Sequence, residues 1–150
     1  MLLMKDQPSK LALKMNQKFD IILVDDDDVY LFVATHIFKS LSRELSIESF
    51  TDGEQALTFF KECAQFQYDT PDVLLLDINM PFLDGWSFLN EYEKLKPGLK
   101  SKVHIYLVTS SNRERDRQRA NQYKDLESYI VKPVSRSKLK KVLADVYNYL

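Results

Sequence analysis

Short apolar runs alternate with longer amphipathic stretches along this chain from about residue 20 onward. A run of consecutive apolar residues between polar ones is typical of a buried parallel strand, because helices cover both faces of such a sheet. The runs predict strands at 21–24, 73–76, 103–108 and 129–131, with a more weakly hydrophobic one at 46–50.

Apolar positions three and four residues apart predict a helix after each strand. We expect these helices at 28–41, 53–65, 85–95 and 112–122, and a last one that begins after a Ser135 cap and runs to Leu150. The helix at 112–122 is unusual, since its arginines and acidic residues leave it almost no apolar face. In the first helix, the residues expected to face inward are Val29, Phe32, Val33, Ile37 and Leu41.

Five strand–helix units in series predict an α/β fold with a five-stranded parallel sheet. Right-handed crossovers would place helices on both faces, which gives a doubly wound, flavodoxin-like (βα)5 arrangement. The chain has 150 residues, the size of one ordinary domain. Residues 1–18 are mixed and polar, so we expect a flexible N-terminal arm there and a single domain at 19–150.

Composition narrows the classes of function. The net charge is −1, which gives no reason to expect nucleic acid as a direct partner. No stretch approaches the roughly 20 apolar residues of a membrane span, so no membrane insertion is expected. The single cysteine, Cys63, excludes an internal disulfide and fits a cytoplasmic protein. We expect Cys63 to be a buried helix residue rather than a reactive thiol.

Polar side chains stand at the carboxyl ends of four predicted strands. Asp25–Asp28 follows the first strand, Asp77 the third, Thr109 the fourth and Lys132 the fifth. Because parallel strands end at one edge of the sheet, these groups should meet in one shallow pocket. Carboxylates so close together repel one another unless a cation lies among them, and hard oxygen ligands suit Mg²⁺. The position of the run after Val24 favours Asp25 and Asp26 as ligands, with Asp27 as an alternative.

Such a pocket suits phosphoryl transfer. A carboxylate can act as the nucleophile and form an aspartyl-phosphate, while Mg²⁺ and Lys132 neutralise the phosphoryl oxygens.

Three other functions fit the sequence less well. A phosphatase of the haloacid dehalogenase type is disfavoured, because it needs a second acid two residues after the nucleophile, where this chain has Asn79. A flavin-binding protein is disfavoured because the three glycines form no phosphate-binding loop. Intact polar residues in the pocket argue against a fold used only for protein contacts.

Four segments carry a resemblance to a known family. They are Val24-Asp25-Asp26, Leu76-Asp77-Ile78-Asn79-Met80-Pro81 with Asp84-Gly85, Val108-Thr109-Ser110, and Lys132-Pro133. In this order and spacing, over roughly residues 19–150, the chain resembles the receiver domain of two-component response regulators, of the stand-alone type.

The resemblance implies a role for each residue of the pocket. Asp77 would accept the phosphoryl group, and Lys132 would bind a phosphoryl oxygen. The Lys132–Pro133 peptide bond would be cis. The domain would be a phosphoacceptor that assists its own phosphorylation and dephosphorylation, and not an enzyme with a separate substrate. The ligands of Mg²⁺ would be Asp25, Asp26, Asp77 and the backbone carbonyl of Asn79.

The resemblance also implies a switch and its partners. Thr109 would move to hydrogen-bond the phosphoryl group, and Tyr129, at the aromatic switch position, would swing inward. The donor would be a sensor histidine kinase or a phosphotransfer protein. The downstream protein target stays unknown, and a homodimer through the helices at 112–122 and 135–150 is compatible with the sequence.

Overall fold

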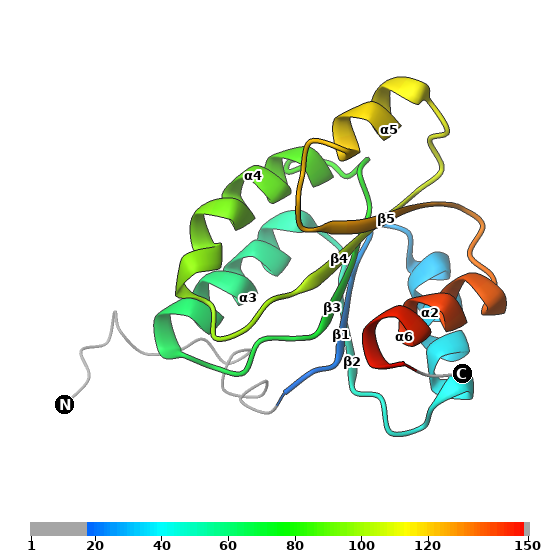
Figure 1. The fold of residues 1–150 in the computed structure, drawn as a ribbon, viewed down its shortest axis with the longest axis horizontal. Helices are drawn as coiled ribbons and strands as arrows, with labels where there is room; N and C mark the ends of the chain where they lie inside the picture. The colour runs from blue at the N-terminus through cyan, green and yellow to red at the C-terminus, as the bar shows by residue number, and fades with distance from the viewer. Residues whose placement is uncertain (1–17, 149–150) are drawn as a thin grey trace.

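The computed structural model describes residues 18–148 and contains one five-stranded sheet with the strand order β2-β1-β3-β4-β5. Every neighbouring pair of strands is parallel. Helices α3 and α4 cover one face and α2 and α6 cover the other (Figure 1). The predicted doubly wound (βα)5 fold is therefore confirmed. The elements are β1 (Ile21–Val24), α2 (Asp28–Leu41), β2 (Ile47–Phe50), α3 (Gly53–Phe66), β3 (Val73–Leu76), α4 (Gly85–Leu95), the 3-10 turn η2 (Lys96–Gly98), β4 (His104–Thr109), α5 (Glu114–Ala120), β5 (Leu126–Val131) and α6 (Arg136–Tyr147).

Successive residues of the central strands point into opposite core layers. In β1, Ile22 and Val24 pack with the α3 and α4 residues, whereas Ile21 and Leu23 pack with α2 and α6. All residues of β1 and β3 are buried. This burial on both faces explains why these strands show no polar alternation.

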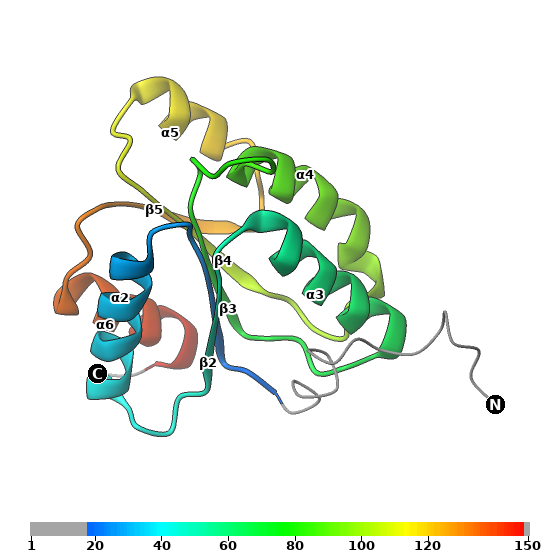
Figure 2. The ribbon, with the colours of Figure 1, turned by 180° about the vertical axis from the view of Figure 1, so that it is seen from behind.

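The edge of the sheet at β5 departs most from the predicted bounds. Strand β5 begins at Leu126 rather than Tyr129, and helix α5 covers only Glu114–Ala120. In the view from behind, α5 lies beside β5 and apart from the main helix layers (Figure 2). Because β5 has only one neighbouring strand and none of its residues is fully buried, its sequence lacks the unbroken apolar run that marks β1 and β3.

The predicted inward face of α2 is wrong for three of its five residues. Val29 is 72% exposed, Phe32 is 73% exposed and Val33 is 39% exposed. Ile37 and Leu41 pack partly against the core as expected. The helix is apolar on most of its circumference, so periodicity did not identify the face that meets the sheet. The buried residues are Tyr30, Leu31, Ala34 and Phe38.

Several smaller expectations concern the ends of the chain and Cys63. Of the expected arm at 1–18, only Lys18 lies within the described residues, where it forms an ion pair with Asp72 at 2.7 Å. Leu150 also lies outside them. Cys63 is buried, and burial raises the pKa of its thiol to about 12, as suits a structural residue. Between residues 18 and 148 no helix has the length and apolarity to cross a membrane.

Candidate functional site

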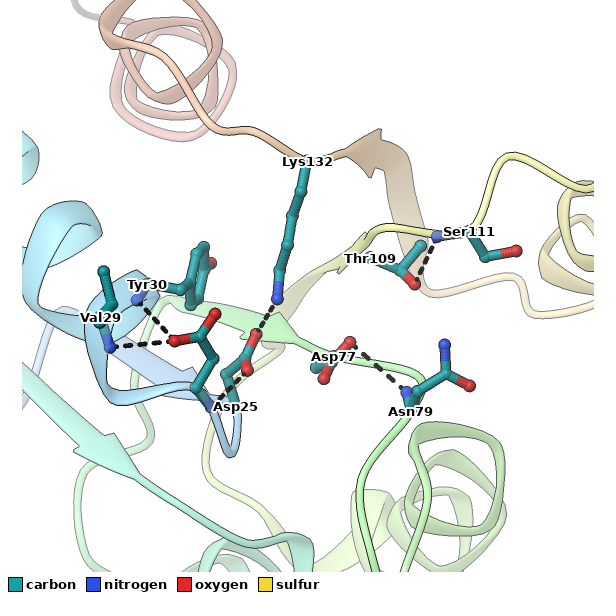
Figure 3. Close-up of polar contacts among 9 residues, drawn as sticks. Asp25, Val29, Tyr30, Asp77, Asn79, Thr109, Ser111 and Lys132 are labelled. Atoms are coloured by element: carbon teal, nitrogen blue, oxygen red, sulfur yellow. Dashed lines mark hydrogen bonds and ion pairs between the residues drawn. The ribbon is translucent and has the colours of Figure 1, made fainter.

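Four strand ends bring the predicted site residues to one edge of the sheet (Figure 3). Asp25 follows β1, Asp77 follows β3, Thr109 ends β4 and Lys132 follows β5. Backbone hydrogen bonds continue the ladder past the strands: the Asp77 N–H donates to the Val24 carbonyl at 3.0 Å, and the Lys132 N–H donates to the Thr109 carbonyl at 2.8 Å. Hydrogen bonding to the neighbouring strands thus fixes the backbone positions of Asp77 and Lys132.

Three carboxylates meet at this edge. Asp25, Asp26 and Asp77 each offer an oxygen, and these oxygens lie within 4.8 Å of one another. Asp25 and Asp77 are buried, whereas Asp26 is exposed, so the cluster has a solvent side. A set of hard oxygen donors that leaves room for water is the arrangement that Mg²⁺ prefers. The residues present therefore fit a divalent cation.

The electrostatics of the cluster also favour a cation. Burial, and then the charge of Asp25, raises the pKa of Asp77 to about 7, against the opposing effect of Lys132. Burial likewise raises the pKa of Asp25, and outweighs the hydrogen bond from Lys132. One ammonium group thus faces two buried carboxylates. A divalent ion would remove this excess of negative charge.

Lys132 lies close to Asp25 in this structure. Its Nζ donates to Asp25 Oδ2 at 2.7 Å, and the same Nζ lies 4.5 Å from the centroid of the Tyr30 ring. The Lys132–Pro133 peptide bond is cis, which confirms that expectation. The sequence analysis missed Tyr30, because nothing near Tyr30 indicates a contact with Lys132, which lies far away along the sequence.

Asp27 has a different task from its acidic neighbours. Its Oδ1 accepts hydrogen bonds from the N–H groups of Val29 at 3.0 Å and Tyr30 at 3.2 Å, so it caps α2. The Asp27 N–H in turn donates to Asp25 Oδ1 at 2.9 Å. The alternative in which Asp27 replaces Asp25 or Asp26 is therefore disfavoured.

The loop after β3 is held tightly against the acidic cluster. The Asn79 N–H donates to Asp77 Oδ1 at 3.4 Å, and the Gly85 N–H donates to the Ile78 carbonyl at 2.8 Å. A Cβ atom at Gly85 would lie 2.5 Å from the Asp77 carbonyl oxygen. The start of α4 can therefore approach Asp77 only because residue 85 is glycine. The role implied for the Asn79 carbonyl as a metal ligand stays a prediction.

Ser111 connects the two residues of the expected switch. Its N–H donates to Thr109 Oγ1 at 3.2 Å, and its carbonyl accepts from the Tyr129 hydroxyl at 2.8 Å. The guanidinium of Arg117 lies 5.0 Å from the centroid of the Tyr129 ring. Thr109 and Tyr129 are thus linked by hydrogen bonds through one residue, Ser111. The position of Ser111, two residues after Thr109, suggests from the sequence that it lies near Thr109. Nothing in the sequence indicates its hydrogen bond with Tyr129.

The family model of the response regulator receiver domain matches residues 21–144 of this chain. Among curated proteins, the probable methanogenesis regulatory protein FilR2 of Methanothrix harundinacea is 26% identical over 138 residues, which cover 92% of this chain and 87% of that protein. The probable transcriptional regulator ycf27 of Guillardia theta is 31% identical, over 86% of this chain but only 45% of that longer protein.

A solved structure agrees with the family model. The two-component response regulator from Cytophaga hutchinsonii superposes with a TM-score of 0.76 at 29% identity, covering 89% of this chain and all of that one (100%). The sheet order, the four strand ends and these comparisons lead to one conclusion. The chain belongs to the family of response regulator receiver domains.

Proposed function

We propose that this receiver domain accepts a phosphoryl group on Asp77 from a phosphohistidine donor, in a reaction that depends on Mg²⁺, and thereby switches a partner-binding surface. The observation that supports this most is the buried Asp77 beside Asp25, Asp26 and the Lys132 ammonium group. We propose that Asp25, Asp26, Asp77 and the Asn79 carbonyl hold the metal ion.

The transfer exchanges one bond for another. A carboxylate oxygen of Asp77 attacks the phosphorus, the P–N bond to the donor histidine breaks, and its electron pair stays on the imidazole nitrogen. A metal ion held by Asp25, Asp26 and Asp77 would neutralise charge on the phosphoryl oxygens. Lys132 leaves Asp25 for a phosphoryl oxygen. The side-chain amide of Asn79 is neither an acid nor a base near neutral pH, so it cannot act as the general acid of a phosphatase.

The charge of the phosphoryl group would reach the surface through Thr109. Drawing Thr109 Oγ1 to the phosphoryl group breaks its hydrogen bond with the Ser111 N–H, and the Ser111 carbonyl then releases Tyr129. A groove of about 430 Å³ beside Tyr129, on the face formed by α5, β5 and α6, would change shape. Moving such a switch from 1:99 to 99:1 requires about 5.5 kcal/mol of differential stabilisation. We propose this face for the downstream protein target or for a second copy of the chain.

Incubation with acetyl phosphate and Mg²⁺ is expected to add one labile phosphoryl group per chain, and the Asp77→Asn variant is expected to add none. Intact-mass spectrometry of the two proteins, with Asp69→Asn as a control at an exposed site, makes the comparison. Chelation of the metal ion should abolish labelling of the wild type. Equal labelling of the Asp77→Asn variant would show that another residue is the acceptor.

Exposed apolar side chains on α2 and in the loop after Asp77 suit a protein donor. Val29 lies in the first turn of α2, next to the Asp27 cap, and Phe32 follows one turn later. Phe82, which is 95% exposed, lies in the loop between Asp77 and α4. A phosphohistidine protein must cover the surface around Asp77 to bring its imidazole to bonding distance, so these side chains are placed to contact it.

The double variant Phe32→Ser/Phe82→Ser is therefore expected to slow transfer from a phosphorylated histidine kinase or phosphotransfer protein by about 10-fold or more, because each lost apolar contact weakens docking by about 1 kcal/mol. Labelling by acetyl phosphate, which needs no docking surface, should keep its wild-type rate. Rapid-quench transfer assays with both donors measure the two rates. An equal loss with both donors would contradict a docking role.

A further inference from the structure

Tyr30 is a buried aromatic residue at the acidic site with no part in the function proposed above. It lies in the first turn of α2, where its N–H is fixed by the Asp27 cap. Its side chain is 7% exposed, and its hydroxyl has no hydrogen-bond partner among the described residues. A buried hydroxyl without a partner is destabilising, so the hydroxyl does not account for this residue. The ring is the part that makes a specific contact.

That contact is with Lys132. The ammonium nitrogen lies 4.5 Å from the ring centroid, and Figure 3 shows the ring beside the end of the lysine chain, above Asp25. Cation–π attraction is stronger when both groups are withdrawn from water, and the Lys132 side chain is only 18% exposed. Lys132 therefore has two attachments, the Asp25 carboxylate and the Tyr30 ring.

The two attachments differ in what happens to them during the proposed reaction. The oxygens of Asp25 are engaged already: Oδ1 accepts from the Asp27 N–H and Oδ2 accepts from Lys132. A divalent ion on Asp25 would compete with the Lys132 ammonium, because two cations on one carboxylate repel each other. The Tyr30 ring carries no formal charge and takes no part in the acidic cluster, so its contact with Lys132 can persist.

We infer that Tyr30 is a positioning residue for Lys132, whose ring face keeps the ammonium group over the acidic site when Asp25 turns to the metal ion. The inference rests on the proposed function, since that function gives Lys132 its task. Without the ring, a lysine released from Asp25 would have open solvent as its alternative position. The ring limits that movement and leaves the ammonium group free to meet a phosphoryl oxygen.

The test compares Tyr30→Phe, which keeps the ring, with Tyr30→Leu, which keeps an apolar side chain but removes it. The rate of phosphorylation by acetyl phosphate at saturating Mg²⁺ should fall about fivefold in the Leu variant and stay at the wild-type value in the Phe variant. The Mg²⁺ dissociation constant, from titration of the protein without a phosphodonor, should stay within about twofold in both, since no metal ligand is changed.

A spectroscopic readout needs no phosphorylation. In the wild type and the Phe variant, the ring current should shift the Lys132 ε-methylene resonances upfield, with and without Mg²⁺. In the Leu variant the resonances should move to the position of a free lysine. If the Phe variant lost as much rate as the Leu variant, or if the Leu variant kept the shifted resonances, the inference would be overturned. Should the wild type fail to accept a phosphoryl group, the proposed function falls, and the resonances still decide whether Tyr30 holds Lys132.

Discussion

In metal-free buffer, the Asp77→Asn variant is expected to be more stable than the wild type by about 2–4 kcal/mol near pH 8, and by much less near pH 4. Burial and the neighbouring Asp25 raise the pKa of Asp77 to about 7 in the folded protein, above the 3.8 of the free side chain. Such a group contributes stability that is fully present below its unfolded pKa and is lost as the pH rises through its folded pKa. Asparagine has no charge to lose or gain, so this loss disappears.

Urea denaturation between about pH 4 and pH 8 in the presence of EDTA measures this difference. The exposed Asp28, outside the acidic cluster, supplies the control: Asp28→Asn should follow the wild-type pH dependence. Near pH 8, added Mg²⁺ should raise the stability of the wild type more than that of the Asp77→Asn variant, which has one carboxylate fewer for the ion. Parallel stability curves for the wild type and Asp77→Asn would refute the electrostatic account of the cluster.

The Gly85→Ala variant is expected to be destabilised by about 2–3 kcal/mol. Its Cβ would lie 2.5 Å from the Asp77 carbonyl oxygen and 2.8 Å from the Ile78 Cα. Both atoms belong to the backbone, so no side-chain rotation relieves the overlap, and either the loop after β3 or the start of α4 must shift. Because that loop carries Asp77 and Asn79, the same shift should weaken Mg²⁺ binding.

Gly98→Ala is the matched control. The nearest atom to a Cβ at Gly98 is the Ala64 Cβ at 3.4 Å, an acceptable contact far from the acidic site. This variant should unfold within about 0.5 kcal/mol of the wild type and keep its Mg²⁺ affinity. Urea denaturation and metal titration measure both quantities. A Gly85→Ala protein as stable as Gly98→Ala would contradict the close approach of α4 to Asp77.

Where burial was complete, the fold followed from the amino-acid sequence. Strands β1 and β3 lie in the middle of the sheet, and their apolar runs predict their bounds to the residue. Strand β5 is an edge strand whose first half contains the exposed Glu127 and Ser128, so that half went unpredicted. Helix α2 is apolar around most of its surface, and only packing against the sheet selects the face with Leu31, Ala34 and Phe38.

The residues of the candidate site could be predicted from the order of the strands, but the contacts between their side chains could not. That Asp25, Asp77, Thr109 and Lys132 meet follows from parallel strands ending at one edge. Which acidic residue caps α2 was decided by geometry, since Asp25–Asp28 presents four identical side chains in a row. The contact of Tyr30 with Lys132 and the link through Ser111 depend on side-chain packing between distant segments, which periodicity and spacing do not describe.

Chemical trapping of the acceptor tests the central claim most directly. The wild-type protein is labelled with acetyl phosphate and Mg²⁺, reduced at once with borohydride, digested and sequenced by tandem mass spectrometry. Borohydride reduces an aspartyl-phosphate to homoserine and leaves free carboxylates unchanged. We expect homoserine at position 77 and aspartate at positions 25 and 26. Homoserine at another acidic position, with aspartate intact at 77, would contradict the assignment of Asp77 as the phosphoacceptor.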